Sequence, residues 1–245
     1  MATLMRQSPE FRYRNISLDC PKFLDIIPIK GYSITYSMNF ELEDKLIKLL
    51  EVKKLDEAIE LAESELKKIP KTNFHKIIGK DLKHLSNNLK EFIETFDRET
   101  SKVLKKKQGF LKSIFSSNNN VKPAAYYCEM NGFTINYDRW FIDLFSFERF
   151  ETEDWDWLSD FYDSTANSMT IKGFEKLQMA FQDVQENDRF DEPNINKAYE
   201  VCELLVILRL QELFRETYKD TKSEWTKTPM FITAHDYYDI IYQVN

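Results

Sequence analysis

Between residues 40 and 96, apolar positions recur with the spacing of an α-helix. Three segments, Leu42–Leu50, Leu55–Ile69 and Leu82–Phe96, return a large apolar residue every three or four positions. Pro70 directly follows the second segment, and proline ends a helix because it cannot donate the next backbone hydrogen bond. The pattern therefore predicts three amphipathic helices, each of which buries one face.

The second segment, LDEAIELAESELKKIP (residues 55–70), resembles the second helix of a tetratricopeptide repeat. The positions that match the packing residues and terminal proline of that family are Leu55, Ala58, Ala62, Leu66 and Pro70. The resemblance covers half of one repeat, and no second copy follows at the repeat's period of about 34 residues. A repeat array that scaffolds peptides is therefore one alternative. A plain helical hairpin is favoured, because a solenoid needs about three units to bury its faces.

After residue 124 the apolar period changes to two. The segment YYCEMNGFTINYDRWFIDLFSF, residues 126–147, predicts two or three strands with turns near Asn131–Gly132 and Tyr137–Asp138. Both faces of the last strand, Trp140–Phe147, are mostly apolar, which is typical of a central strand covered on two sides. Asp143 interrupts this strand and must be paired if it is buried. Arg139, His235 or a backbone donor are the candidate partners.

The remaining sequence predicts two more helices and a last strand. Phe174, Leu177, Phe181 and Val184 share one helical face, with Thr170 as the candidate cap. A longer helix is expected from about Lys197 to Tyr218, and it is apolar nearly all round, so we expect it to be buried. Residues 229–245 alternate between apolar and polar positions, which predicts the last strand.

This order of elements predicts an α+β fold. A mostly helical front region, residues 1–115, is expected to pack on an acidic body, residues 124–245, with a small, mainly antiparallel sheet and long helices. We expect the two regions to form one compact unit.

Charge is distributed unevenly between the two halves of the chain. Residues 1–124 hold 23 Lys and Arg against 17 Asp and Glu, a net +6, whereas residues 125–245 hold 11 against 24, a net −13. Such asymmetry bears on partners rather than on fold. The acidic half should repel nucleic acid and attract cations or basic proteins.

Cysteine usage and hydropathy indicate the compartment. Cys20, Cys128 and Cys202 are widely spaced and odd in number, so they predict neither a disulfide framework nor a metal-ligand pair. The longest wholly apolar run, LLVIL at 204–208, is far shorter than the roughly 20 residues of a membrane span. The sequence therefore predicts a reduced, cytoplasmic protein that does not associate with a membrane.

One stretch combines aromatic and acidic residues densely. Residues 139–164 hold nine aromatic, eight acidic and only two basic residues. If the chain is extended there, Trp155 and Trp157 point one way while Asp154 and Asp156 point the other. The rings would form a floor against the core, and the carboxylates a lip that faces solvent. We call this candidate partner-binding site the acidic lip: Glu151, Glu153, Asp154, Trp155, Asp156, Trp157 and Asp160.

Three interpretations of the acidic lip remain open at the level of sequence. It is a solvated face, a surface that steers and binds a basic protein, or a hard-metal site of a metal-dependent hydrolase. The metal interpretation would use Asp143, Asp154, Asp156 or Asp160, although their spacing matches no EF-hand loop.

No catalytic signature accompanies these carboxylates. The chain contains no nucleophile elbow, no zinc-protease motif, no P-loop and no dinucleotide fingerprint. Structural roles are expected for His75, His84 and His235, because none has a neighbour at ligand or triad spacing. His235 and Asp236 are adjacent, which in a strand places them on opposite faces. We therefore expect no catalytic residues, no bound metal and no cofactor.

A set of segments resembles a group of largely uncharacterised bacterial cytoplasmic proteins, which in turn loosely resemble the immunity partners of secreted antibacterial toxins. The segments are YYCEMN, RWFIDLFSF, DWDWLSD, MTIKGFEKLQ and TAHDYYDIIY. The resemblance spans about residues 70–245 and brings no established catalytic residues with it. It implies a stoichiometric protein that occludes the active surface of a toxin. The acidic half of the chain suits a basic toxin domain as the partner, such as a nuclease. A toxin of another class, bound through the helices, is the alternative.

Overall fold

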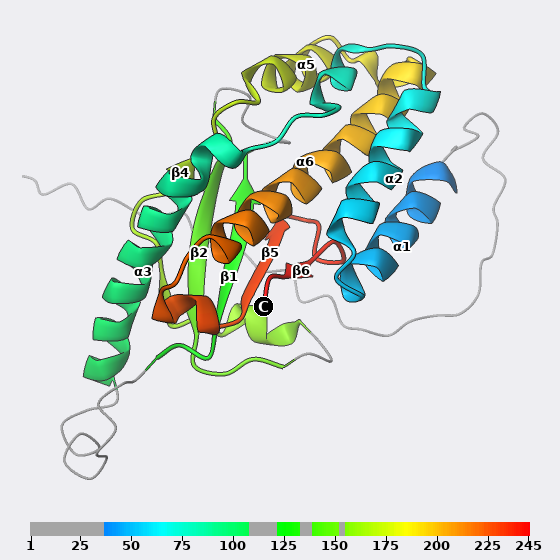
Figure 1. Cartoon of the computed structure of the whole chain (residues 1–245). Coiled ribbons are helices and arrows are strands. Elements are labelled where there is room, and N and C mark those ends of the chain that lie inside the picture. Colours follow the sequence, from blue (N-terminus) through cyan, green and yellow to red (C-terminus); the bar gives the residue numbers. More distant parts are fainter. Residues whose placement is uncertain (1–36, 108–121, 133–138, 152–154) are drawn as a thin grey trace, which may run out of the picture. The chain divides into compact units, whose positions relative to one another are not determined.

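The computed structural model of the chain describes residues 37–107, 122–132, 139–151 and 155–245 (Figure 1). These residues belong to one compact unit, residues 36–245. Cys20, the expected turn at 137–138, and Glu153 and Asp154 of the acidic lip lie outside the described residues. No helix in the described part has the length and apolar character needed to cross a membrane.

A mixed six-stranded sheet lies at the centre of the unit, in the order β3-β2-β1-β5-β6, with β4 also paired to β2. The strands are β1 (Ala125–Asn131), β2 (Phe141–Phe147), β3 (Asp163–Ser164), β4 (Met169–Thr170), β5 (Met230–Ala234) and β6 (Tyr242–Gln243). Only the β1–β5 pair is parallel among these strands, because a long connection that contains two helices separates the two in the chain.

Helices cover one face of this sheet. They are α1 (Ser37–Glu51), α2 (Leu55–Lys68), α3 (Ser86–Lys107), α5 (Glu175–Glu186) and α6 (Pro193–Lys219). In Figure 1, α6 crosses in front of the sheet, with α2 and α1 on one side of it and α3 on the other. The α+β prediction is thus confirmed, and one apolar core contains residues of both predicted regions.

The predicted long helix is the central element of the helical layer. It begins with Pro193 at its first turn and runs to Lys219, so it includes the predicted range 197–218. Every residue from Val201 to Gln211 is buried, which confirms the expectation from its all-round apolar pattern. The α1–α2 hairpin packs on this helix.

An ion pair between two mostly buried side chains, Arg209 and Glu63, fixes α2 on α6. The guanidinium of Arg209 lies 2.6 Å from a carboxylate oxygen of Glu63 and 2.8 Å from one of Glu212. Burial alone would raise the pKa of Glu63, but hydrogen bonds from the Gly79 N–H, Lys67 and Arg209 outweigh it and lower that pKa. Both terminal nitrogens of the Arg209 guanidinium are therefore paired with carboxylates inside the helical layer.

Two hydrogen bonds position α3 on the sheet. The hydroxyl of Tyr126 donates to Asp97 over 2.6 Å. Thr100 and Ser146 bond through their hydroxyls, also over 2.6 Å, at a buried position. Because buried polar groups must find partners, these pairs select one register of α3 on the sheet.

Two predicted details were wrong. Thr170 does not cap α5, because the helix begins at Glu175, whose own carboxylate accepts the Gly173 N–H over 2.8 Å. Thr170 lies in β4 and accepts a hydrogen bond from Arg139. The tail forms two short strands rather than one, because Asp236 adopts a left-handed φ of 67° and the chain turns there.

Candidate functional site

The face of the sheet opposite the helices is the candidate site, and it has two parts. Strand alternation presents Tyr127, Glu129 and Asn131 from β1 and the odd-numbered residues of β2 on this face. The segment after β2 covers one end of it. The other end is polar and partly exposed, and we call it the polar sector: Glu129, Asn131, Asp143, Thr165 and His235.

An aromatic floor lies under the acidic lip. The ring centroids of Phe147 and Trp157 are 4.6 Å apart, and those of Trp157 and Phe231 are 5.3 Å apart. Trp155 lies 5.8 Å from Phe231, and Phe150 lies 5.6 Å from it. Both tryptophans therefore point into the same cluster, as predicted. Edge-to-face ring pairs of this kind are favourable beyond the area that they bury.

The backbone of the acidic lip differs from the prediction. Asp156–Ser159 forms a turn of 3₁₀ helix rather than an extended segment, and Ser159 donates a hydrogen bond to the Asp156 carbonyl. Trp157 is 5% exposed, because the turn folds its indole under the segment onto Phe147 and Phe231. Alternation along the chain therefore predicted correctly that both tryptophan rings point toward the sheet, but it predicted the wrong backbone conformation for Asp156–Ser159.

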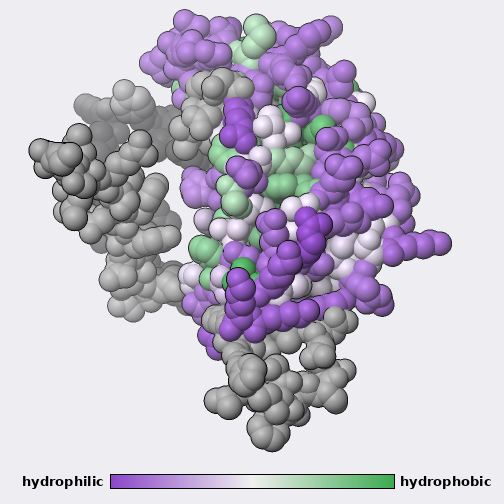
Figure 2. Space-filling view, turned by 90° about the vertical axis from the view of Figure 1, so that its left-hand side faces the viewer, coloured by the Kyte–Doolittle hydropathy of each residue, from purple (hydrophilic) through white to green (hydrophobic). Residues whose placement is uncertain are grey.

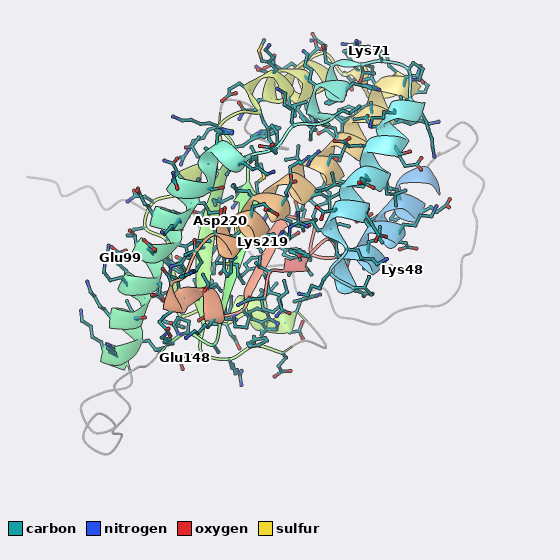
Figure 3. The ribbon with its side chains drawn as sticks, in the orientation of Figure 1. Lys48, Lys71, Glu99, Glu148, Lys219 and Asp220 are labelled. Carbon is teal, nitrogen blue, oxygen red and sulfur yellow. The ribbon has the colours of Figure 1, made fainter. Side chains whose placement is uncertain are left out.

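The carboxylates of the lip face water where the structure describes them. Glu151, Asp156 and Asp160 are exposed. Asp160 forms an ion pair with Arg149 over 3.1 Å, and both side chains are mostly exposed. Glu148, which precedes this segment, is labelled near the lower end of the sheet in Figure 3. The aromatic floor thus anchors Trp155 and Trp157, and the carboxylates beside them point into solvent.

Two carboxylates meet in the polar sector. Glu129 of β1 and Asp143 of β2 are direct partners in the antiparallel register. The hydroxyl of Tyr127 donates to Glu129 over 3.2 Å, and burial followed by the Glu129 carboxylate raises the pKa of Tyr127. Thr165 donates to Asp143 over 3.2 Å. The predicted need for a partner at Asp143 is confirmed, but a threonine hydroxyl fills it.

His235 joins this pair from the end of β5. Its Nδ1 lies 3.1 Å from a carboxylate oxygen of Glu129, and its Nε2 lies 3.6 Å from one of Asp236. The prediction that His235 and Asp236 lie on opposite faces of a strand was wrong, because β5 ends at Ala234 and both residues lie in the turn. The sequence did contain a signal for the polar sector, because each of its titratable residues ends or interrupts an apolar run: Glu129, Asp143 and His235.

The other histidines bond to the backbone. The Thr72 N–H donates to Nδ1 of His75 over 3.1 Å, and Nε2 of His84 lies 3.1 Å from the Lys172 carbonyl. These contacts agree with the structural roles expected for both residues. Cys128 and Cys202 are buried free thiols, and burial raises the pKa of each.

A buried carboxyl group that the sequence analysis missed lies in α6. Burial raises the pKa of Glu203 to about 8, although hydrogen bonds from Tyr237 and Tyr199 counter that effect. The signal was visible as the single acidic residue within an otherwise apolar stretch of the helix, 201–208. Since Tyr237 belongs to the turn that carries His235, this carboxyl group links α6 to the polar sector.

Two shallow pockets lie elsewhere, near the end of α6. One of about 360 Å³ is lined by Arg215, Tyr218, Lys219, Thr226, Tyr242, Val244 and Asn245, and one of about 340 Å³ by Lys83, Ser86, Asn87, Glu216 and Asp220. Figure 3 labels Lys219 and Asp220 at this end of the helix. Arg215 is already paired with Asp56 and Glu216. Neither pocket contains a residue of the acidic lip.

The geometry does not gather the carboxylates proposed for a metal site. Asp143 lies in the sheet, whereas Asp156 and Asp160 lie on the lip. Within the described ranges, no three His, Cys, Asp or Glu side chains are close enough together to hold a metal ion. Asp154, the fourth candidate, lies outside those ranges.

Fold and site together define an α+β protein with one sheet face under helices and the other bearing aromatic and acidic side chains. Figure 2, which views the side where α3 lies in Figure 1, shows apolar and weakly polar residues gathered beside strongly hydrophilic ones. No protein-family model, curated protein or solved structure matches the chain. Its function is therefore inferred from the geometry of these residues.

Proposed function

We propose that this chain is a non-enzymatic protein-binding module of the immunity type, which recognises a basic protein through the acidic lip. In this role it acts in the cytoplasm and occludes the active surface of a toxin in a stoichiometric complex. The proposal requires no cofactor and no nucleic acid.

The observation that carries the proposal is the aromatic anchoring of an exposed, charged segment. Asp156 and Asp160 face water, while Trp155 and Trp157 beside them pack on Phe231. Residues 155–160, which are held in this way, lose little further conformational entropy when a partner binds. The affinity for the partner then depends on how well the two surfaces match in shape and charge, because ordering these residues costs little free energy.

Electrostatics favours a basic partner. The half of the chain that contains the acidic lip carries a net charge of −13. Clustered charge of one sign raises the rate at which an oppositely charged protein associates, and salt weakens that effect. A nuclease toxin, whose groove must bind phosphates, has the required basic surface.

The test begins with capture of a partner from the native host at low salt, followed by kinetics with the purified partner. The variant D156K/D160K should slow association about tenfold or more at low salt, because two attractive charges become repulsive. The matched control is E60K/E91K. It makes the same change in net charge at exposed positions of α2 and α3.

The comparison between these variants decides the site. A loss confined to D156K/D160K supports binding through the lip. An equal loss in both variants would indicate only a net-charge effect, and no loss in either would contradict the proposed surface. A melting temperature that rises with Mg²⁺, Mn²⁺, Ca²⁺ or Zn²⁺ would instead favour the metal-dependent alternative.

A further inference from the structure

The polar sector places two carboxylates directly opposite each other on neighbouring strands. Glu129 and Asp143 are antiparallel partners, and side chains in this relation have Cβ atoms about 4.5–5.5 Å apart. Like charges at such positions destabilise a sheet. The two carboxylates therefore repel each other at partly exposed positions of the sheet.

Neutralisation of this pair within the described residues is incomplete. Glu129 faces one titratable nitrogen, that of His235, and receives the Tyr127 hydroxyl. Asp143 receives the Thr165 hydroxyl and no other side-chain donor from the part of the chain that the structure describes. Across the described ranges, no Lys or Arg forms an ion pair with either carboxylate. A cation supplied from outside would relieve the repulsion between them.

Aromatic rings border the same sector. Phe145 lies next to Asp143 on the same sheet face, and its ring centroid is 5.1 Å from that of Phe161, which is 46% exposed. At the far end, the guanidinium of Arg139 already lies over the ring of Phe141, 4.8 Å from the centroid. The chain itself thus stacks a guanidinium on a ring at this edge.

We propose that the polar sector docks an arginine side chain of the basic protein partner, between the Glu129–Asp143 pair and the ring of Phe145. An arginine fits better than a lysine because its flat, weakly hydrated guanidinium pairs bidentately with carboxylates and stacks on rings. The inference rests on the proposed function and names the chemistry of that partner. Tyr127 and Phe145 make the sector continuous with the lip, since their rings lie 6.0 Å apart and Tyr127 belongs to the aromatic floor.

The experiment uses the full chain, labelled with ¹⁵N, and two small probes that need no identified partner. N-acetyl-arginine amide carries the guanidinium, and N-acetyl-citrulline amide has the same shape without the charge. We expect saturable NMR shifts in the millimolar range for Glu129, Asp143, Thr165 and the His235 ring with the arginine probe. The citrulline probe should give none.

Two variants locate the binding. E129Q/D143N keeps the shapes of the side chains and removes their charges, so it should weaken the arginine probe about tenfold or more while the melting temperature does not fall. D156N/D160N removes the same number of charges from the lip and should leave the shifts in the polar sector unchanged.

Three results would overturn the inference: equal shifts with both probes, shifts spread evenly over the lip and the sector, or shifts that persist in E129Q/D143N. These outcomes are separable from failure of the proposed function. A partner that depends on Asp156 and Asp160 but not on Glu129 and Asp143 would keep the binding module and reject the arginine site. If the chain binds the arginine probe selectively but no protein partner can be found, the arginine site would stand and the proposed binding module would be rejected.

Discussion

The two faces of the central sheet treat their side chains in opposite ways. On the face under the helices, β1, β2 and β5 present residues that are buried without exception, such as Cys128, Leu144 and Ile232 at 0% exposure. On the other face, one end is an aromatic floor and the other is the polar sector, where the His235 side chain is 49% exposed. The same strands therefore serve a conventional core and a partly exposed surface.

This difference indicates where stability and recognition are located. Under the helices, a charge is tolerated only if it is neutralised, as at Glu203, or paired, as at Arg209. On the opposite face, the carboxylates of Glu129 and Asp143 lie next to each other without a Lys or Arg partner among the described residues. Stability should therefore depend on the first face, and partner recognition on the second.

The largest expected effect concerns the pH dependence of stability at Glu203. Because its pKa is raised from its ordinary value of 4.5 to about 8, the folded chain keeps a proton that the unfolded chain releases. The free energy of unfolding should therefore fall as the pH rises from about 4.5 to 8, by up to roughly 5 kcal/mol, and then level off. Denaturant melts of E203Q should lack this decline.

The control for this prediction is E151Q, which removes an exposed carboxylate of the lip and should retain the decline. Glu200 and Tyr237 both face Glu203, so their titration adds to the curve of the wild-type chain. A curve for E203Q that parallels the wild type would show that Glu203 is ionised in the folded chain.

The second effect compares a buried ion pair with an exposed one. R209M removes the cation shared by the mostly buried carboxylates of Glu63 and Glu212, of which Glu63 keeps Lys67, and should cost about 3–5 kcal/mol. R149M removes an exposed partner of Asp160 and should cost less than about 1 kcal/mol. Urea unfolding measures both. Adding E63Q to R209M should recover part of the loss, and no recovery would argue that packing, not charge, is responsible.

The third effect compares neighbouring residues of β2 that point to opposite faces. L144A should cost about 3 kcal/mol, because it opens a cavity under the helices. F145A should cost roughly 1–2 kcal/mol, because its ring is only half-buried. Both values come from urea unfolding with an unchanged denaturant slope. Equal costs would mean that the second face is as tightly packed as the first.

The smallest expected effect on stability is that of D156K/D160K. Both residues are exposed, and the ion pair between Asp160 and Arg149 lies at the surface, so the free energy of unfolding should change by less than about 1 kcal/mol. Thermal unfolding checks this. A larger loss would mean that these carboxylates hold the lip in place, and any slower association would then have a structural cause.

The sequence predicted the helices and the two faces of β2 well, because both are local periodicities. Leu42, Leu46 and Leu50 recur at helical spacing and are buried, as expected. Alternation along 140–147 assigned Asp143 and Phe145 to one face and Leu144 to the other. Alternation in the next segment also predicted the orientation of Trp155 and Trp157 correctly. It did not predict the 3₁₀ turn that produces this orientation.

The remaining features depend on which distant segments meet. Glu129, Asp143 and His235 are spread over more than a hundred residues of the chain. They come together through the register of β1 with β2 and the parallel pairing of β1 with β5. A one-residue slip in either pairing would separate them, and no local pattern sets that register.

The sequence by itself determined the fold class, the helical spans, the acidic half of the chain and the aromatic content of the lip. Each of these follows from composition or from periods of two and 3.6 residues. Only the tertiary structure decided that Phe231 completes the floor under the lip, that Thr165 satisfies Asp143 and that Glu203 is buried among tyrosines. The physical reason is that burial and pairing are properties of neighbours in space, which the order of residues along the chain does not specify.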